Sequence, residues 1–134
     1  MAIMEIVNST AQTITSGGKI ALGNVNIRCG QGDGVYNNVD TITLNKNGIY
    51  QIIIKSVMSS TVAGQSVGFA LAYGGTVSTV ANTSETVTDA GDSATLTLPK
   101  LVKICGNPIT LTLVNSGSAS TVYNNVIVDI VKVA

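Results

Sequence analysis

The residue types that most often carry out chemistry in proteins are scarce in this chain. It has no histidine, and its seven acidic residues are scattered. Histidine is the usual general base and the commonest metal ligand, so its absence removes most catalytic arrangements. Cys29 and Cys105 have no base near them in sequence, because the neighbouring Arg28 cannot accept a proton. The carboxylates show no spacing that suggests a glycosidase pair. We therefore predict that the protein is not an enzyme and has no catalytic residues.

Two pairs of acidic residues are the only candidates for holding a hard cation. They are Asp89 with Asp92, and Asp33 with Asp40. Neither pair belongs to the alternating Asp/Asn pattern of a calcium-binding loop, and Asp in such short polar stretches usually shapes a turn. The glycine-rich residues 30–34 lack the Lys-Ser/Thr of a phosphate-binding loop, so they read as a plain loop. We predict no metal site and no cofactor.

The aromatic residues divide into two groups. Tyr50 and Phe69 fall in strongly apolar strands, where packing in the core is the expected role. Tyr36 and Tyr123 each stand in the sequence Val-Tyr-Asn-Asn-Val, beside polar pairs. A stacking surface needs exposed aromatic rings. We therefore take Tyr36 and Tyr123 as the candidates for an outward-facing contact surface.

The two cysteines, Cys29 and Cys105, allow two interpretations. They are far apart in sequence, and a disulfide between two strands is one of them. The other is a pair of reduced, small, buried thiols, which a protein made in the cytoplasm favours. Glu5, Asn8, Ser9 and Thr10 interrupt any signal-peptide core at the start of the chain, so we expect synthesis in the cytoplasm.

The candidate residues must be positioned by β-strands, and the strand pattern is clearest in residues 41–57, TITLNKNGIYQIIIKSV. Residues 41–44 alternate polar and apolar side chains, which indicates a strand with one buried face. Asn47-Gly48 tolerates a tight reversal, so we predict a hairpin with a second strand over residues 49–57. Around residues 52–54 both faces of that strand are apolar. That segment needs cover on two sides.

The rest of the chain repeats this pattern of short strands and turn residues. Pro99 suits a strand end or an edge strand, because it cannot donate to a ladder. The predicted strands are residues 3–7, 10–15, 19–22, 25–29, 67–73, 76–80, 85–88, 94–98, 101–104, 109–114 and 125–133, and residues 35–39 lead into the hairpin. This spacing favours an all-β, two-sheet antiparallel sandwich or jelly roll, and residues 1–134 read as one domain.

The composition favours assembly over a lone subunit. Charged residues make up 10% of the chain and hydrophobic residues 45%, whereas an ordinary soluble domain is about 25% charged. A surface partly covered by other subunits explains this better than a monomer does. Seven basic and seven acidic residues leave no basic stripe for nucleic acid. No apolar run approaches the ~20 residues that a membrane-spanning helix needs.

Several segments resemble the trimeric jelly roll shared by tumour necrosis factor and complement-type globular heads, and above all its small phage versions. They are residues 11–25 (AQTITSGGKIALGNV), 41–57 with Gly48-Ile49-Tyr50, 93–104 (SATLTLPKLVKI), 109–117 (ITLTLVNSG) and 124–133 (NNVIVDIVKV). The opening NSTAQTIT, residues 8–15, resembles the start of head-fibre or decoration proteins of tailed phages. The resemblance covers most of the chain in the family's order.

The resemblance implies a homotrimer whose inner sheet, with the first and last strands as neighbours, packs around a three-fold axis. Residues 3–7 and 126–133 would then line the trimer. The last strand has two apolar faces, one with Val126, Val128 and Ile130 and the other with Ile127, Val131 and Val133. One face can serve the core and the other the neighbouring subunits. The predicted trimer-interface residues are Ile3, Ile6, Val126, Val128 and Ile130.

By the same resemblance, the expected function is a non-enzymatic structural virion protein, a homotrimeric phage head fibre or capsid decoration protein. Its partners would be itself and a capsid or other virion protein, with no nucleic acid and no membrane. The alternative is a trimeric, adhesin-like module that recognises a glycan or protein on a host surface. A hydrolase of surface polysaccharide is the third candidate, and it would need a carboxylate pair that the spacing does not suggest.

Overall fold

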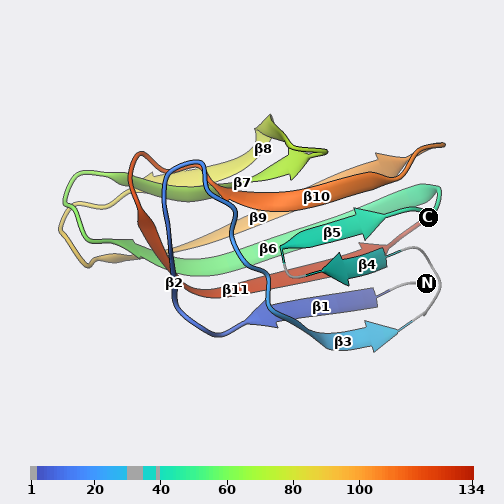
Figure 1. Cartoon of the computed structure of the whole chain (residues 1–134), viewed down its shortest axis with the longest axis horizontal. Helices are drawn as coiled ribbons and strands as arrows, with labels where there is room; N and C mark the ends of the chain where they lie inside the picture. The colour runs from blue at the N-terminus through green and yellow to red at the C-terminus, as the bar shows by residue number, and fades with distance from the viewer. Residues whose placement is uncertain (1–2, 30–34, 39) are drawn as a thin grey trace.

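Strands make up all the regular structure in the described part of the chain, which is residues 3–29, 35–38 and 40–134 of a computed structural model (Figure 1). In chain order they are β1 (Ile3–Asn8), β2 (Gln12–Ile14), β3 (Asn24–Cys29), β4 (Val35–Asn38), β5 (Thr41–Leu44), β6 (Gly48–Ser60), β7 (Ser66–Tyr73), β8 (Thr76–Thr86), β9 (Ser93–Ile104), β10 (Ile109–Asn115) and β11 (Thr121–Lys132). The abundance of branched residues explains this outcome, since Val, Ile and Thr fit a pleated surface better than a helix.

The strands form two antiparallel sheets. In sheet A the order is β3-β1-β11-β6-β9, with β2 also paired to β11; in sheet B it is β4-β5-β10-β7-β8. The first and last strands are neighbours, with Ile3 opposite Val131 and Asn8 opposite Val126. For this reason β1 begins and β11 ends at the same end of the sandwich (Figure 1). The predicted all-β, two-sheet jelly roll is confirmed.

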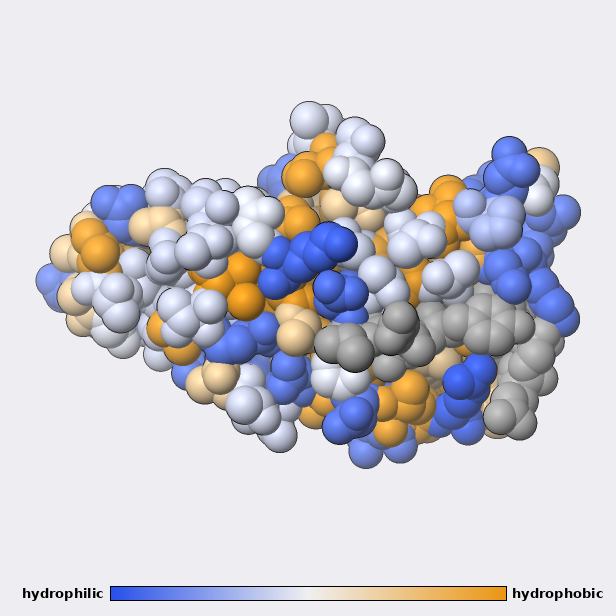
Figure 2. Space-filling model, in the orientation of Figure 1, coloured by the Kyte–Doolittle hydropathy of each residue, from blue (hydrophilic) through white to orange (hydrophobic). Residues whose placement is uncertain are grey.

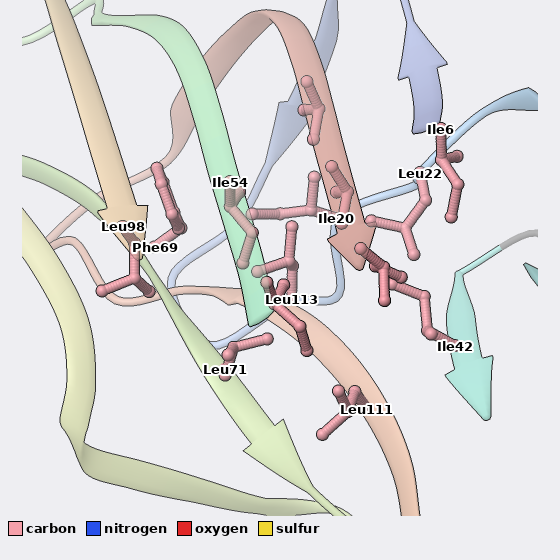
Figure 3. Packing of buried hydrophobic residues seen from close by; sticks show 14 of the residues in the cluster. Ile6, Ile20, Leu22, Ile42, Ile54, Phe69, Leu71, Leu98, Leu111 and Leu113 are labelled. Carbon is pink, nitrogen blue, oxygen red and sulfur yellow. The ribbon is translucent and has the colours of Figure 1, made fainter. Parts of the chain in front are cut away.

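The core fills the space between the two sheets. Isoleucine and leucine side chains from both sheets point toward one another there, among them Ile54 from β6, Leu113 from β10 and Leu71 from β7 (Figure 3). Tyr50 and Phe69 are buried in the same cluster, as the sequence predicted. Burial of a large apolar side chain contributes about 1.5–3 kcal/mol, so this layer supplies most of the favourable free energy of folding.

The predicted hairpin over residues 41–57 is wrong. β5 lies in sheet B, where it pairs with β4 and β10, whereas β6 lies in sheet A between β11 and β9. The chain therefore crosses from one sheet to the other between Leu44 and Gly48. Asn47 does not use a positive φ; its Oδ1 accepts a hydrogen bond from the Gly106 N–H at 2.8 Å. Local turn chemistry permitted a reversal, but the strand partners are set by contacts distant in sequence.

Several other predicted strands differ from the observed ones. Residues 19–22 form no strand: Lys19 makes a single bridge to Val114, and Ile20 and Leu22 enter the core. Residues 76–80 and 85–88 belong largely to one strand, β8. The predicted β7–β8 hairpin is confirmed, with Gly74 and Gly75 at positive φ in its turn. Farther along β8, the register passes from Val77 to Asn82 while β7 advances by only two residues.

β9 is an edge strand of sheet A, and Pro99 lies within it opposite Ile53 of β6. A central strand forms hydrogen bonds with a neighbour on each side, and proline has no backbone N–H to donate to either of them. The sequence expectation that Pro99 marks a strand end or an edge is therefore confirmed.

Candidate assembly surface

The outer face of sheet A is an apolar surface, and β11 shows how it arises. Val126, Val128 and Ile130 point into the core and are buried. Side chains alternate across a strand, so Ile127, Asp129 and Val131 point the other way, where they are half-buried. Only one of the two apolar faces of β11 is used by the sandwich. The other needs a different explanation.

Neighbouring strands extend this outer face in register. Ile127 lies between Val7 of β1 and Lys55 of β6. Asp129 lies between Glu5 and Ile53, and Val131 lies between Ile3 and Gln51. The exposed apolar members of the face are Leu101 (61% exposed), Ile27 (50%), Val133 (48%), Ile3 (39%) and Ile49 (36%).

The size of the face matches a subunit interface. The five strands β3, β1, β11, β6 and β9 have 6, 6, 12, 13 and 12 residues, so at ~3.3 Å per residue and ~4.8 Å between strands they span roughly 800 Å². A standard protein–protein interface buries ~800 Å² on each partner. Large exposed apolar areas on soluble proteins mark interaction sites. The outer face of sheet A is therefore the candidate functional surface.

A pair of carboxylates lies within this face. Glu5 of β1 and Asp129 of β11 are directly opposite each other, so their Cβ atoms are about 5 Å apart. Asn26 Nδ2 donates a hydrogen bond to Glu5 Oε1 at 2.8 Å. Partial burial raises the pKa of Asp129 to about 6, and a hydrogen bond to Glu5 and its negative charge add to that rise. The pKa of Glu5 is lowered, first by the hydrogen bond with Asp129 and then by Asn26. The pair therefore shares one proton near pH 6.

The cations on the same face come from β6 and β9. Lys55 is exposed opposite Ile127, and Lys103 is exposed opposite Ile49. Arg28 of β3 is turned elsewhere, since its Nη2 donates a hydrogen bond to the Val35 carbonyl oxygen at 3.2 Å. The outer face thus combines apolar side chains with one acidic pair, two lysines and the exposed polar residues Gln51, Thr95 and Thr97.

Comparison with solved structures identifies this architecture. The globular domain of zebrafish complement 1qA protein matches with a TM-score of 0.71 over 100% of this chain and 98% of that one, at 4% identity. The Eiger TNF of S. frugiperda matches with a TM-score of 0.69 over 99% and 91%, at 7% identity. The fold is a tumour-necrosis-factor-like jelly roll. PRD1 vertex protein P5 shares this jelly roll with a TM-score of 0.60 over 99% and 97%, at 16% identity. No family model and no curated protein matches the sequence.

Within this jelly roll, four of the five predicted interface residues are not on the surface. Ile6, Val126, Val128 and Ile130 are at most 1% exposed, because they face the core between the sheets. They have no accessible area to offer another subunit, so this part of the prediction is wrong. Ile3 does lie on the outer face. β11 does have two apolar faces, but the face predicted to meet other subunits packs in the core, and the face with Ile127 and Val131 points outward.

The predicted contact tyrosines also change role. Tyr123 is fully buried, and its hydroxyl donates a hydrogen bond to the Gly68 carbonyl oxygen at 2.5 Å, so it is no contact residue. This burial raises the pKa of Tyr123. The side chain of Tyr36 lies outside the described residues; its backbone belongs to β4, opposite Thr43. Val39, which closes the first Val-Tyr-Asn-Asn-Val sequence, is also outside them.

The remaining candidates resolve as follows. Cys29 and Cys105 are exposed and are not joined to each other, so the prediction of buried thiols is wrong. Asp89 and Asp92 shape a turn: the Asp89 N–H donates to Asp92 Oδ2 at 3.2 Å, and the Asp92 N–H donates to the Asp89 carbonyl oxygen at 3.2 Å. Residues 30–34, with Asp33, lie outside the described part of the chain.

The described residues contain no cluster of three or more potential metal ligands and no pocket. No helix among them is long and apolar enough to span a membrane.

Among the residues that the structure describes, the side of the molecule that Figure 2 shows has no continuous apolar surface. Its hydrophobic residues form small patches that polar and charged side chains separate. Away from sheet A, exposed apolar side chains occur on β8, where Val80 is 75% exposed and Val77 50%. Ser78 Oγ accepts hydrogen bonds from the Val80 and Ala81 N–H groups, at 3.2 and 2.9 Å, in the part of β8 that departs from regular pairing. This feature is a second, much smaller candidate for contact with another molecule.

Proposed function

We propose that the protein is a non-enzymatic structural module that assembles into a homotrimer through the outer face of sheet A. The single observation that carries this proposal is the apolar surface around Ile127, Val131 and Ile53 in a chain with only 10% charged residues. Such a face is costly to leave in water, and burying it between copies removes that cost. The three-fold arrangement is what the resemblance to the tumour necrosis factor jelly roll implies.

We further propose that this trimer is a virion component, a head fibre or a capsid decoration protein. The likeness of fold to a vertex protein of phage PRD1 supports this role. The resemblance of residues 8–15 to the opening of head-fibre and decoration proteins of tailed phages points the same way. The partner would be a capsid or other virion protein, and the chain would be made in the cytoplasm of a bacterial host.

A trimeric binding module is the second candidate. The fold is shared with the globular domain of a complement 1qA protein, which favours a head that presents loops and strands to a partner. The exposed Val80 and Val77 on β8 are candidate residues for such a contact. A host-surface glycan or protein would then be the ligand.

The oligomeric state tests the assembly proposal. Multi-angle light scattering at pH 5.5 should give three subunits for the wild type and one for Ile127→Lys, which places a charge in the middle of the outer face. Val80→Lys is the matched control, because it adds the same charge to an exposed valine of sheet B, and it should remain trimeric. A wild-type protein that stays a single subunit at high concentration would contradict the proposal.

Localisation separates the two functions. Cryo-electron microscopy of phage particles should place the trimer on the capsid if it is a virion component. Binding of isolated trimer to host cells, reduced by Val80→Lys, would favour the binding module.

A further inference from the structure

The Glu5–Asp129 pair lies within the outer face of sheet A, so a second subunit that covers this face would also cover the two carboxylates. Glu5 is in β1 and Asp129 in β11, the second and third strands of the five, so the pair lies inside the face and not at its rim. Ile27 lies opposite Glu5 on one side, and Ile53 lies opposite Asp129 on the other. Two carboxylates directly opposite each other among apolar neighbours repel when both are ionised.

We propose that this pair makes self-assembly through the outer face dependent on pH, with each subunit retaining one shared proton when the face is covered. The inference rests on the proposed self-association and adds its regulation. Covering the face removes water from the carboxylates, and an ionised group without water or a partner is costly to bury. A shared proton removes one of the two charges and converts the repulsion into a hydrogen bond.

In the single subunit, where the face is uncovered, Asp129 already holds its proton to a higher pH than an ordinary aspartate does. Burial is the first cause that raises the pKa of Asp129, to about 6, and the hydrogen bond and charge of Glu5 follow. Further burial by another subunit acts in the same direction. Assembly should therefore take up protons at any pH above about 6, where the separate subunits have lost them.

Other charged groups near the pair do not neutralise it within the subunit. Lys55 on β6 is the cation on the same face nearest in register, opposite Ile127. Lys103 on β9 lies toward the far end of the face, opposite Ile49. Lys100 and Lys132 lie opposite Ile52 and Tyr50, which belong to the core side of the sheet. On β3, Asn26 donates a neutral hydrogen bond to Glu5, and Arg28 is engaged with Val35; β2 carries no ionisable side chain.

The linkage predicts a large effect with a definite sign. Each proton taken up on assembly changes the association constant by up to tenfold per pH unit. Three subunits bring three pairs, so the constant for forming the trimer should fall by as much as ~1,000-fold for each pH unit above about 6. The assembly should be tight near pH 5.5 and weak near pH 8.

Sedimentation velocity of the full chain at pH 5.5, 6.5, 7.5 and 8.5, at constant ionic strength and with EDTA to remove metal ions, tests this proposal. Where the trimer is too tight to dissociate by dilution, its urea midpoint of dissociation gives the same dependence. Asp129→Asn and Glu5→Gln keep the shape of the side chains but remove one charge. Both variants should assemble at pH 8.5 as tightly as the wild type does at pH 5.5. Glu85→Gln, an exposed carboxylate of β8, is the matched control and should follow the wild type.

The outcomes separate this inference from the proposed function. A wild type that assembles equally well at every pH, or more tightly as pH rises, would overturn the shared proton while leaving the assembly surface intact. Assembly that tightens as pH rises would mean that the ionised carboxylates meet a cation, such as Lys55 of a neighbouring copy. A wild type that never assembles, together with Asp129→Asn and Glu5→Gln variants that never assemble, would overturn the assembly surface itself.

Discussion

The hydroxyl of Tyr123 on β11 donates a hydrogen bond to the carbonyl oxygen of Gly68 on β7, at 2.5 Å across the interior of the sandwich. The bond joins sheet A to sheet B between two buried residues. Gly68 itself has no room for a side chain, because an added Cβ would lie 2.2 Å from the Thr83 carbonyl oxygen. Glycine at position 68 therefore permits the close approach of β7 to β8, at the residue whose carbonyl oxygen accepts the hydrogen bond from Tyr123.

Tyr123→Phe should destabilise the subunit by about 1–3 kcal/mol, because the Gly68 carbonyl oxygen is left buried without a donor. Urea unfolding at pH 7 measures this change. The variant should still assemble, since the side chain does not reach the surface. A variant that unfolds like the wild type but fails to assemble would instead place Tyr123 at an interface.

The same tyrosine should make the fold sensitive to alkali. Burial raises the pKa of Tyr123 above its ordinary value of 10. A group with a raised pKa in the folded state contributes stability below its unfolded-state pKa, and that stability is lost as pH rises above it. The free energy of unfolding should therefore fall above pH 10 by up to ~1.4 kcal/mol per pH unit. Tyr123→Phe should reduce this slope in urea titrations between pH 9 and pH 11.

Neighbouring residues of β11 should respond differently to the same substitution. Val128→Lys buries an unpaired charge in the core and should cost at least ~3–5 kcal/mol, a large part of total stability. Ile127→Lys points the same charge outward and should leave the subunit folded but separate. Circular dichroism and light scattering together distinguish the two results. If Val128→Lys were folded and dissociated, the assignment of the two faces would be reversed.

The separated subunit should lose stability as pH rises through the titration of Asp129. Its folded-state pKa of about 6 lies above its ordinary value of 3.8, so the stability it contributes is fully present below pH 3.8 and is lost as pH rises through 6. Asp129→Asn should raise the free energy of unfolding at pH 8 by on the order of 1 kcal/mol, because solvent still screens the group. Urea unfolding in dilute solution at pH 4 to 8 measures this.

A carboxyl carbon NMR titration provides the direct check. Asp129 should titrate near pH 6 in the wild type and at lower pH in Glu5→Gln, where the neighbouring charge is gone. An unchanged midpoint in that variant would remove Glu5 as a cause.

Thiol labelling should report whether the outer face is covered. Cys29 lies at the end of β3, opposite Ile3 of the outer face, and it is exposed in the single subunit. In a Cys105→Ser background, a maleimide reagent should modify Cys29 more slowly in the assembled protein than in the dissociated Ile127→Lys variant. Equal rates in both forms would show that this corner of the face stays open. The converse Cys29→Ser background gives the corresponding rate for Cys105.

The sequence predicted the sheets better than it predicted their connections. Alternation of apolar residues located most strands, and the glycine pair of the β7–β8 hairpin was sufficient for that turn. Leu44 and Gly48, by contrast, end and begin strands of different sheets. Nothing within residues 41–57 distinguishes a hairpin from a crossover, because the pairing of β6 with β9 and β11 is decided by residues about thirty-five to eighty positions away.

The orientation of β11 was ambiguous for a different reason. Both of its faces are apolar, so the alternation shows two faces without showing which is inward. One signal was present: Asp129 shares a face with Ile127 and Val131, and a charged residue rarely points into a core without a partner. Glu5 marks the same face on β1. Reading these two carboxylates first would have assigned the outer face correctly.

Pro99 has a consequence for how copies of this chain meet. It interrupts the free hydrogen-bonding edge of β9 near the middle of that strand. Exposed edges are templates onto which a further strand can add, and proline is one of the devices that block such addition. A fibril grown by continuing sheet A from one molecule to the next is disfavoured at this position. At this edge, contact between copies is left to side chains, which favours a finite, closed particle over an endless ribbon.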